Sequence, residues 1–94
     1  NDIFVPNIFS PNIDGQNDVL KVYGMGIDWI NIRIFDRWGE LIYESQSTED
    51  AMNVGWNGTK KGKEMSPQVY VYYLEGAFLD GEEIFLQGNI TLVK

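Results

Sequence analysis

The sequence predicts an all-β protein, an antiparallel, immunoglobulin-like β-sandwich of six to seven strands. Apolar and polar residues alternate with a period of two around Ile32, and glycine-containing turns separate two pairs of expected strands. No segment of ten or more residues has a helical period. The 94 residues fit one domain, residues 1–94, and 44% of them are hydrophobic, so a core can form without disulfide bonds.

The N-terminal third is expected to contribute two short strands. Residues 3–9 are predicted as an edge strand, because Pro6 lacks an amide donor and interrupts a hydrogen-bond ladder. Residues 19–23 are predicted as a second strand, and Gly24, Met25 and Gly26 as the turn that follows it.

The middle of the chain predicts a hairpin. Ile30, Ile32 and Ile34 alternate with polar residues and so share one face of a strand. A three-residue loop of Arg37, Trp38 and Gly39 then leads to a returning strand at 40–43, with glycine at the position that needs a positive φ. Residues 46–52 are predicted as loop, and residues 54–57 as a short extended piece.

A second hairpin is predicted at the C-terminal end of the chain. Residues 69–79 are rich in β-branched and aromatic residues, Asp80 and Gly81 form a two-residue turn signal, and residues 82–93 return. The run from Tyr70 to Leu74 has no polar face, so its strand is expected in the middle of the domain. Ile84, Leu86, Ile90 and Leu92 share one parity on the returning strand.

Composition excludes several classes of function. The chain has no cysteine and no histidine, which excludes thiolate zinc sites, histidine metal ligands and Ser-His-Asp or Cys-His catalysis. Seven basic against fourteen acidic residues give a net charge of −7, the wrong sign for nucleic-acid binding. The lysines of TKKGK are interpreted as a solvated turn. No apolar run is long enough for a membrane span.

One loop has the residue types of a calcium site. Asn12, Asp14, Gln16 and Asp18 carry oxygen-bearing side chains at every second position, as a hard cation requires, although the spacing is not that of an EF-hand. The alternative is a pair of turns in which the Asn and Asp side chains bind their own backbone. The turns are the favoured explanation, so we expect no cofactor, with calcium as the one metal to test.

The aromatic residues and the acidic pairs have a structural interpretation as well. Trp29, Trp38 and Trp56 are expected in the core or at its rim, with Trp56 closing one end of the sandwich, rather than in a sugar-binding platform. The pairs 49–50 and 82–83 are adjacent carboxylates that face opposite sides of a strand, so they do not converge as glycosidase residues do. We therefore expect no enzymatic activity.

Several motifs, in order, resemble one family across nearly the whole chain. FSPNIDGQNDV is similar to FSPNGDGxND, IFDRWGELIYES to IFNRWGxxVFxS, GWNGT to GWDGT, and TKKGKEMSPQVYVYYLE to GKxxPxGVYxYxL. LDGEEIFLQGNITLVK is similar to the closing hairpin of the same family. The family is the type B C-terminal domain of type IX secretion cargo, also called the gliding-motility-associated C-terminal domain.

The resemblance implies a C-terminal sorting signal of a larger secreted or surface protein of Bacteroidota, often an adhesin. The chain starts at Asn1 without methionine and is expected to be part of such a protein. Its partners would be the type IX translocon and an outer-membrane protein of the PorP/SprF-like kind, and its destination the cell surface or the medium. The residues expected to be read by the translocon lie in the first loop, the first hairpin turn and the C-terminus: Asn12, Asp14, Asn17, Asp18, Arg37, Trp38, Glu40 and Lys94.

The chain departs from the family pattern at three positions. Ile13 stands in place of a small residue, Asn57 in place of Asp, and Gln68 in place of Gly. The first two substitutions weaken the calcium interpretation, and the third is expected to leave its strand intact. A glycan-binding or adhesive sandwich remains as the alternative function.

Overall fold

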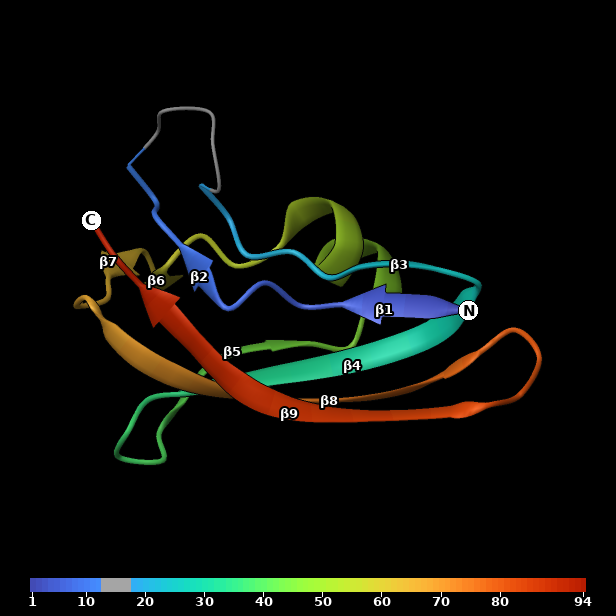
Figure 1. The fold of residues 1–94 in the computed structure, drawn as a ribbon. Coiled ribbons are helices and arrows are strands. Elements are labelled where there is room, and N and C mark those ends of the chain that lie inside the picture. Colours follow the sequence, from blue (N-terminus) through green and yellow to red (C-terminus); the bar gives the residue numbers. More distant parts are fainter. Residues whose placement is uncertain (13–17) are drawn as a thin grey trace.

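The computed structural model describes residues 1–12 and 18–94 and confirms the predicted fold class (Figure 1). Within these residues the chain forms one short helix, η1, and nine strands rather than the predicted six to seven, because strands of two residues such as β6 and β7 are too short to leave a periodic pattern. In chain order they are β1 Asp2–Phe4, β2 Ile8–Phe9, β3 Tyr23–Met25, β4 Ile27–Phe35, β5 Leu41–Ser45, η1 Asp50–Val54, β6 Thr59–Lys60, β7 Lys63–Glu64, β8 Gln68–Phe78 and β9 Glu83–Leu92.

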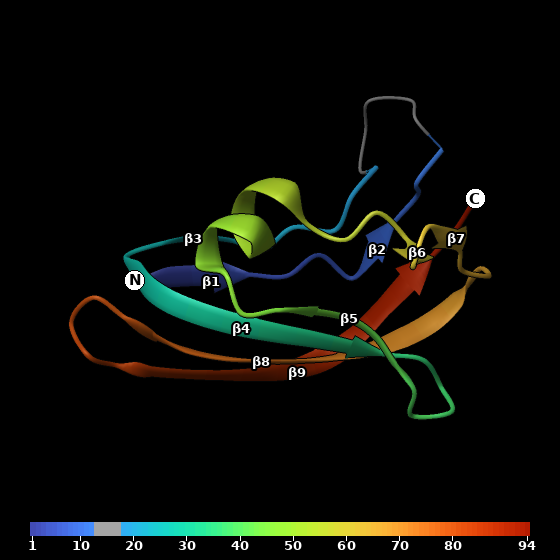
Figure 2. The ribbon, with the colours of Figure 1, turned by 180° about the vertical axis from the view of Figure 1, so that it is seen from behind.

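A five-stranded sheet forms one layer of the molecule, with the strand order β2-β9-β8-β4-β5. As predicted, β8 is its central strand. The β1-β3 pair and η1 lie together over one face of this sheet and form the second layer (Figures 1 and 2). The pairing is antiparallel except between β2 and β9, which run parallel.

The core lies between these two layers. Ile30, Ile32 and Ile34 are all buried, which confirms the face predicted from their spacing. On β9 the expected parity is confirmed too, since Ile84, Ile90 and Leu92 are buried and Leu86 packs against the same core. The opposite face of the sheet carries no other element of the described chain (Figures 1 and 2).

The two predicted hairpins are confirmed, and both turns have the same construction. In the first, the Asp36 N–H donates to Glu40 O at 3.0 Å and Gly39 has φ 84°. In the second, the Phe78 N–H donates to Glu82 O at 2.8 Å and Gly81 has φ 92°. The prediction of a two-residue turn at Asp80 and Gly81 was therefore wrong, because the loop has three residues and begins at Leu79.

The side chain of Asp80 supports the second turn. The Glu82 N–H donates to Asp80 Oδ1 at 2.9 Å, and this hydrogen bond lowers the pKa of the Asp80 carboxyl. The turn is thus held by the charged form of Asp80, which dominates at neutral pH.

The N-terminal third differs from the prediction in three ways. The predicted strand at residues 19–23 is wrong, because β3 begins only at Tyr23 and Leu20 forms an isolated bridge with Trp56. Residues on either side of Pro6 join different layers, since β1 pairs with β3 whereas β2 pairs with β9. The predicted turn at Gly24 and Met25 is also wrong, because both residues belong to β3 and only Gly26, with φ 77°, turns the chain. Gly24 can pair closely in this strand because it has no Cβ, which would lie 2.4 Å from Asp2 O.

Part of the predicted loop 46–52, and Val54 of the piece predicted as extended at 54–57, belong to a short helix. The Asp50 N–H donates to Ser47 Oγ at 3.2 Å, and the Ala51 N–H donates to Ser47 O at 3.0 Å. Ala51 is buried and its carbonyl accepts a hydrogen bond from the Val22 N–H at 2.9 Å. A single buried alanine on so short a segment gives no helical period, which is why the helix was missed.

Candidate functional site

The described borders of the first loop, the turn of residues 37–40 and the C-terminus lie at the same end of the sandwich. Figures 1 and 2 place the C-terminus, the β6-β7 hairpin and the turn between β4 and β5 at this end, which we call the Lys94 end. The N-terminus and the turn between β8 and β9 lie at the other end, the Asn1 end. The fold thus gathers segments that are more than 70 residues apart in the sequence, from Asn12 to Lys94.

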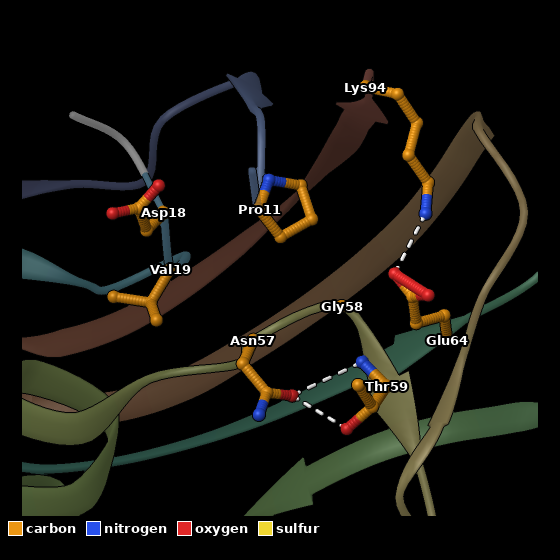
Figure 3. Close-up of a pocket in the computed structure, with 8 residues that line it drawn as sticks. All are labelled: Pro11, Asp18, Val19, Asn57, Gly58, Thr59, Glu64 and Lys94. Carbon is orange, nitrogen blue, oxygen red and sulfur yellow. Dashed lines mark hydrogen bonds and ion pairs between the residues drawn. The ribbon is translucent and has the colours of Figure 1, made fainter. Parts of the chain in front are cut away.

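A pocket of about 320 Å³ opens at the Lys94 end (Figure 3). Its walls come from the two sides of the first loop, the GWNGT turn, β7 and the C-terminus. The lining residues are Pro11, Asp18, Val19, Asn57, Gly58, Thr59, Glu64 and Lys94. Two of the predicted recognition residues, Asp18 and Lys94, therefore share one concave surface.

Asn12 belongs to the same part of the chain. It is exposed, and its N–H donates to Ser10 O at 2.9 Å. The predictions for Asp14, Gln16 and Asn17 concern positions outside the described residues.

The GWNGT turn forms the floor of the pocket. Asn57 Oδ1 accepts hydrogen bonds from the Thr59 N–H at 3.2 Å and the Thr59 hydroxyl at 2.7 Å, so an uncharged amide closes this turn (Figure 3). Gly58 has φ 84°, and a Cβ there would lie 3.1 Å from Pro11. The positive φ favours glycine at this position, and any other residue would also require the Pro11 side chain to shift.

An ion pair stands at the rim of the pocket. Lys94 Nζ lies 3.1 Å from Glu64 Oε1, which connects the C-terminal residue to β7 (Figure 3). Both side chains are largely exposed, so the pair adds little to stability. Its effect is to orient the C-terminal side chain relative to the pocket.

Asp36, which sequence reasoning missed, organises the turn of residues 37–40. Its buried side chain accepts hydrogen bonds at Oδ1 from the N–H groups of Trp38 and Glu40, both at 2.9 Å. The signal was present in the sequence, because an aspartate ahead of a glycine-containing turn often binds the backbone two residues on. This carboxylate fixes how Arg37 and Trp38 are presented.

Trp38 is on the surface, and its predicted burial was wrong. The side chain is 79% exposed, and the Arg37 guanidinium lies 5.1 Å from the centre of its ring. The adjacent Glu40 forms an ion pair with Lys60, which links this turn to the β6-β7 hairpin. The cause is the hairpin geometry, since a side chain at the centre of a three-residue loop projects beyond the sheet.

Trp56 occupies the place predicted for it at one end of the core. It is buried, with ring centroids 5.2 Å from those of Phe9 and Tyr70, and its Nε1–H donates to Thr59 O at 2.9 Å. Burial raises the pKa of Tyr70, whose hydroxyl donates to Ser66 O at 2.7 Å.

Trp29, in contrast, is 44% exposed on the uncovered face of the sheet, so its predicted burial was wrong as well.

The acidic residues of the described chain do not converge on a metal-binding cluster. No group of three or more His, Cys, Asp or Glu side chains within residues 1–12 and 18–94 is arranged to hold a metal ion. The pairs at 49–50 and 82–83 are exposed. Of the four candidate calcium ligands, Asn12 and Asp18 are described, and both border the first loop.

We expect the melting temperature to be the same in calcium and in a chelator, because loop turns closed by Asn and Asp side chains need no ion. The measurement is a thermal melt of the purified chain in each condition, with magnesium as the control cation. A calcium-specific rise of several degrees would instead establish a calcium site on the folded chain.

The comparisons with known proteins bear directly on this chain. The model of the CHU_C type IX secretion signal domain matches residues 3–92. The chain belongs to the type IX secretion signal domain family. The match confirms the family predicted from the sequence motifs. A search of curated proteins found no match.

A solved structure supports the fold of this secretion signal domain. CopC from Methylosinus trichosporium OB3b superposes with a TM-score of 0.58 at 16% sequence identity, over 96% of this chain and 92% of CopC. At this identity the likeness concerns the β-sandwich fold alone.

Family membership sets the general role of the domain. It is a sorting signal, which implies an interaction with the type IX secretion system and export of the protein that carries it. Domains of this family are typically non-catalytic. Within the described residues, no helix has the length and apolar character needed to cross a membrane.

Proposed function

We propose that this domain is a non-catalytic docking module whose Lys94 end is read by the type IX translocon. The observation that carries the proposal is the gathering of the predicted recognition surfaces at that end: the borders of the first loop, the turn of residues 37–40, and Lys94. A sorting signal that is recognised by a partner needs exposed side chains in a fixed arrangement and needs no reactive groups.

The Lys94 end is built to hold such a pattern. Hydrogen bonds to Asp36 fix the turn on which Arg37 and Trp38 are exposed, and hydrogen bonds to Asn57 close the turn beneath the pocket. Side chains held in place before binding lose less conformational entropy when a partner binds. Exposed Trp and Arg residues are also those that most often dominate protein interfaces.

Surface complementarity is the proposed mode of recognition, in preference to strand addition at the C-terminus. β9 pairs with β8 on one side and with β2 on the other, and the Val93 N–H donates to Phe9 O at 3.0 Å. The last strand therefore offers no free edge near Lys94 to a partner strand.

The partners we propose are the translocon and an outer-membrane protein of the PorP/SprF-like kind. In this scheme the parent protein enters the periplasm, and the folded domain then brings it to the outer membrane. The cargo reaches the cell surface or the medium, and no metal or cofactor takes part in the recognition.

The test is the export of a reporter protein fused to the N-terminus of the chain. We expect the fusion to reach the medium or cell surface in a host with the translocon and to remain in the periplasm of the same host without it. Retention in the periplasm of both hosts would refute the sorting role. Arrival outside both hosts would show that the translocon does not read the domain.

Glycan binding is a second candidate, supported by the uncovered face of the sheet. Trp29 on β4 and Phe85 on β9 are exposed on either side of β8, and both line an open groove with Glu75. Aromatic rings beside carboxylates suit sugar binding. Binding to a glycan array that is lost in Trp29→Ala would support this function, and an array without binding would exclude it for the glycans tested.

A further inference from the structure

The positive charges of this acidic chain are concentrated at the Lys94 end. Of the seven Lys and Arg residues, five belong to segments located there: Arg37, Lys60, Lys61, Lys63 and Lys94 (Figures 1 and 2). The other two are Lys21 and Arg33. The segments of the Asn1 end, residues 1–3, 24–29 and 76–84, contain no Lys or Arg and five carboxylate side chains: Asp2, Asp28, Asp80, Glu82 and Glu83.

Three of these five cations have no ion-pair partner among the described carboxylates. Glu40 pairs with Lys60, and Glu64 pairs with Lys94. Arg37, Lys61 and Lys63 have no such carboxylate within ion-pair distance, although the chain has twice as many acidic as basic residues. Their charges are therefore available to a partner.

The β6-β7 hairpin places like charges against each other. Lys60 and Lys63 are directly opposite in the strand pairing, and Lys61 lies between them at the tip. Like charges on opposite strand positions are destabilising. Folding of the isolated domain gives no reason for this arrangement.

Lys61 also has an unfavourable backbone conformation. Its φ is 53° and that of Gly62 is 80°, so the two-residue tip uses left-handed geometry at both positions. Among the described residues, Lys61 is the one non-glycine residue with positive φ. Asn-Gly is the preferred sequence for such a tip, because asparagine tolerates this conformation far better than lysine does.

We propose that the β6-β7 hairpin is a cationic contact for an acidic protein surface on the outer-membrane partner. The inference rests on the proposed function and adds the chemistry of the partner. The unpaired lysines at the tip and the neighbouring Arg37, which lies over Trp38, form the contact. The Asn1 end carries five carboxylates without Lys or Arg, whereas at the Lys94 end the cations offset the carboxylates, so an acidic partner surface repels the Lys94 end least and meets it first.

A protein is favoured over a lipid surface as the occupant. Three unpaired cations are fewer than the clusters of about four to eight Lys and Arg residues that bind anionic lipids. An exposed tryptophan beneath an arginine is, in addition, the kind of anchor found at the centre of protein interfaces.

The test uses the double variant Lys61→Asn/Lys63→Gln in the reporter fusion. This variant leaves the Lys60–Glu40 pair in place, gives the tip its preferred Asn-Gly sequence and removes the like charge opposite Lys60. We expect its melting temperature to rise by a few degrees while export falls about tenfold, through the loss of electrostatic attraction. Export equal to that of the wild type would overturn the inference.

Two control variants separate the hairpin from other effects. Lys21→Gln/Arg33→Gln removes the same amount of charge outside the β6-β7 hairpin, together with the exposed Arg33–Glu44 ion pair, and is expected to be exported like the wild type. An equal loss of export in this control would assign the effect to net charge and overturn the inference. Lys61→Arg/Lys63→Arg keeps both charges and should be exported normally, whereas a loss as large as that of the neutral variant would also overturn it.

The remaining outcomes concern the sorting role and the lipid. If the wild-type fusion is not exported, both the proposed function and this inference are refuted. If the wild-type fusion and the neutral variant are both exported normally, only the inference is refuted.

The lipid alternative is tested by sedimenting the purified chain with vesicles of phosphatidylcholine and phosphatidylglycerol. We expect no binding, and binding that the neutral variant loses would assign the hairpin to lipid instead.

Discussion

Replacing Trp56 by alanine is expected to lower the free energy of unfolding by about 4 kcal/mol, a large share of what holds a domain of this size together. The indole packs against Phe9 from β2 and Tyr70 from β8, and it donates a hydrogen bond to Thr59 O. Its removal leaves a cavity where the first loop, the GWNGT turn and the sheet meet. The measurement is urea unfolding followed by circular dichroism.

Trp56→Phe is the matched control for this variant. It keeps an aromatic ring between Phe9 and Tyr70 but loses the hydrogen bond to Thr59, so we expect roughly half the loss in stability.

If recognition requires the folded domain, export of a fusion carrying Trp56→Ala will fall with the folded fraction. Normal export of a fully unfolded variant would show that the translocon reads a linear sequence.

Replacing Asp36 by alanine is expected to lower the free energy of unfolding by about 2 kcal/mol, because two partly buried hydrogen bonds to its carboxylate are lost together. The N–H groups of Trp38 and Glu40 both donate to this carboxylate. We expect their amide hydrogens to exchange faster and export to fall, since Arg37 and Trp38 are then displayed on a loose turn.

The variant Asp36→Asn distinguishes the effect of the two hydrogen bonds from the effect of the negative charge on Asp36. Asparagine keeps a side-chain oxygen where Oδ1 accepts both hydrogen bonds, so we expect most of the stability and export to be retained. If Asp36→Ala folds with normal amide protection of Trp38 and Glu40, the carboxylate is not the group that organises the turn.

Much of the fold could be predicted from the sequence, because it is encoded locally. The alternation of Ile30, Ile32 and Ile34 identified the buried face of β4, and Gly39 identified the turn that follows it. Family motifs are also short local strings, so the amino-acid sequence alone was enough to recognise the family. Trp56 was placed correctly because glycine and asparagine next to a large aromatic mark a turn that closes on the core.

The parts that were missed depend on tertiary contacts. The parallel pairing of β2 with β9 joins residues more than 80 positions apart, and no local pattern specifies it. Trp38 was misplaced because hydrophobicity alone predicts burial, whereas its position in the loop determines its exposure. The clustering of Lys94 with Lys61 and Lys63 became visible only when the fold brought the C-terminus beside the β6-β7 hairpin.

The most direct test of the account is photo-crosslinking from matched positions at the two ends of the domain. Trp38 at the Lys94 end is 79% exposed and Leu79 at the Asn1 end is 72% exposed, so a photoreactive amino acid at either position meets solvent equally. In a host that exports the fusion, we expect position 38 to crosslink to an outer-membrane component of the secretion system and position 79 to give no such product. Crosslinking from position 79 without crosslinking from position 38 would contradict the account.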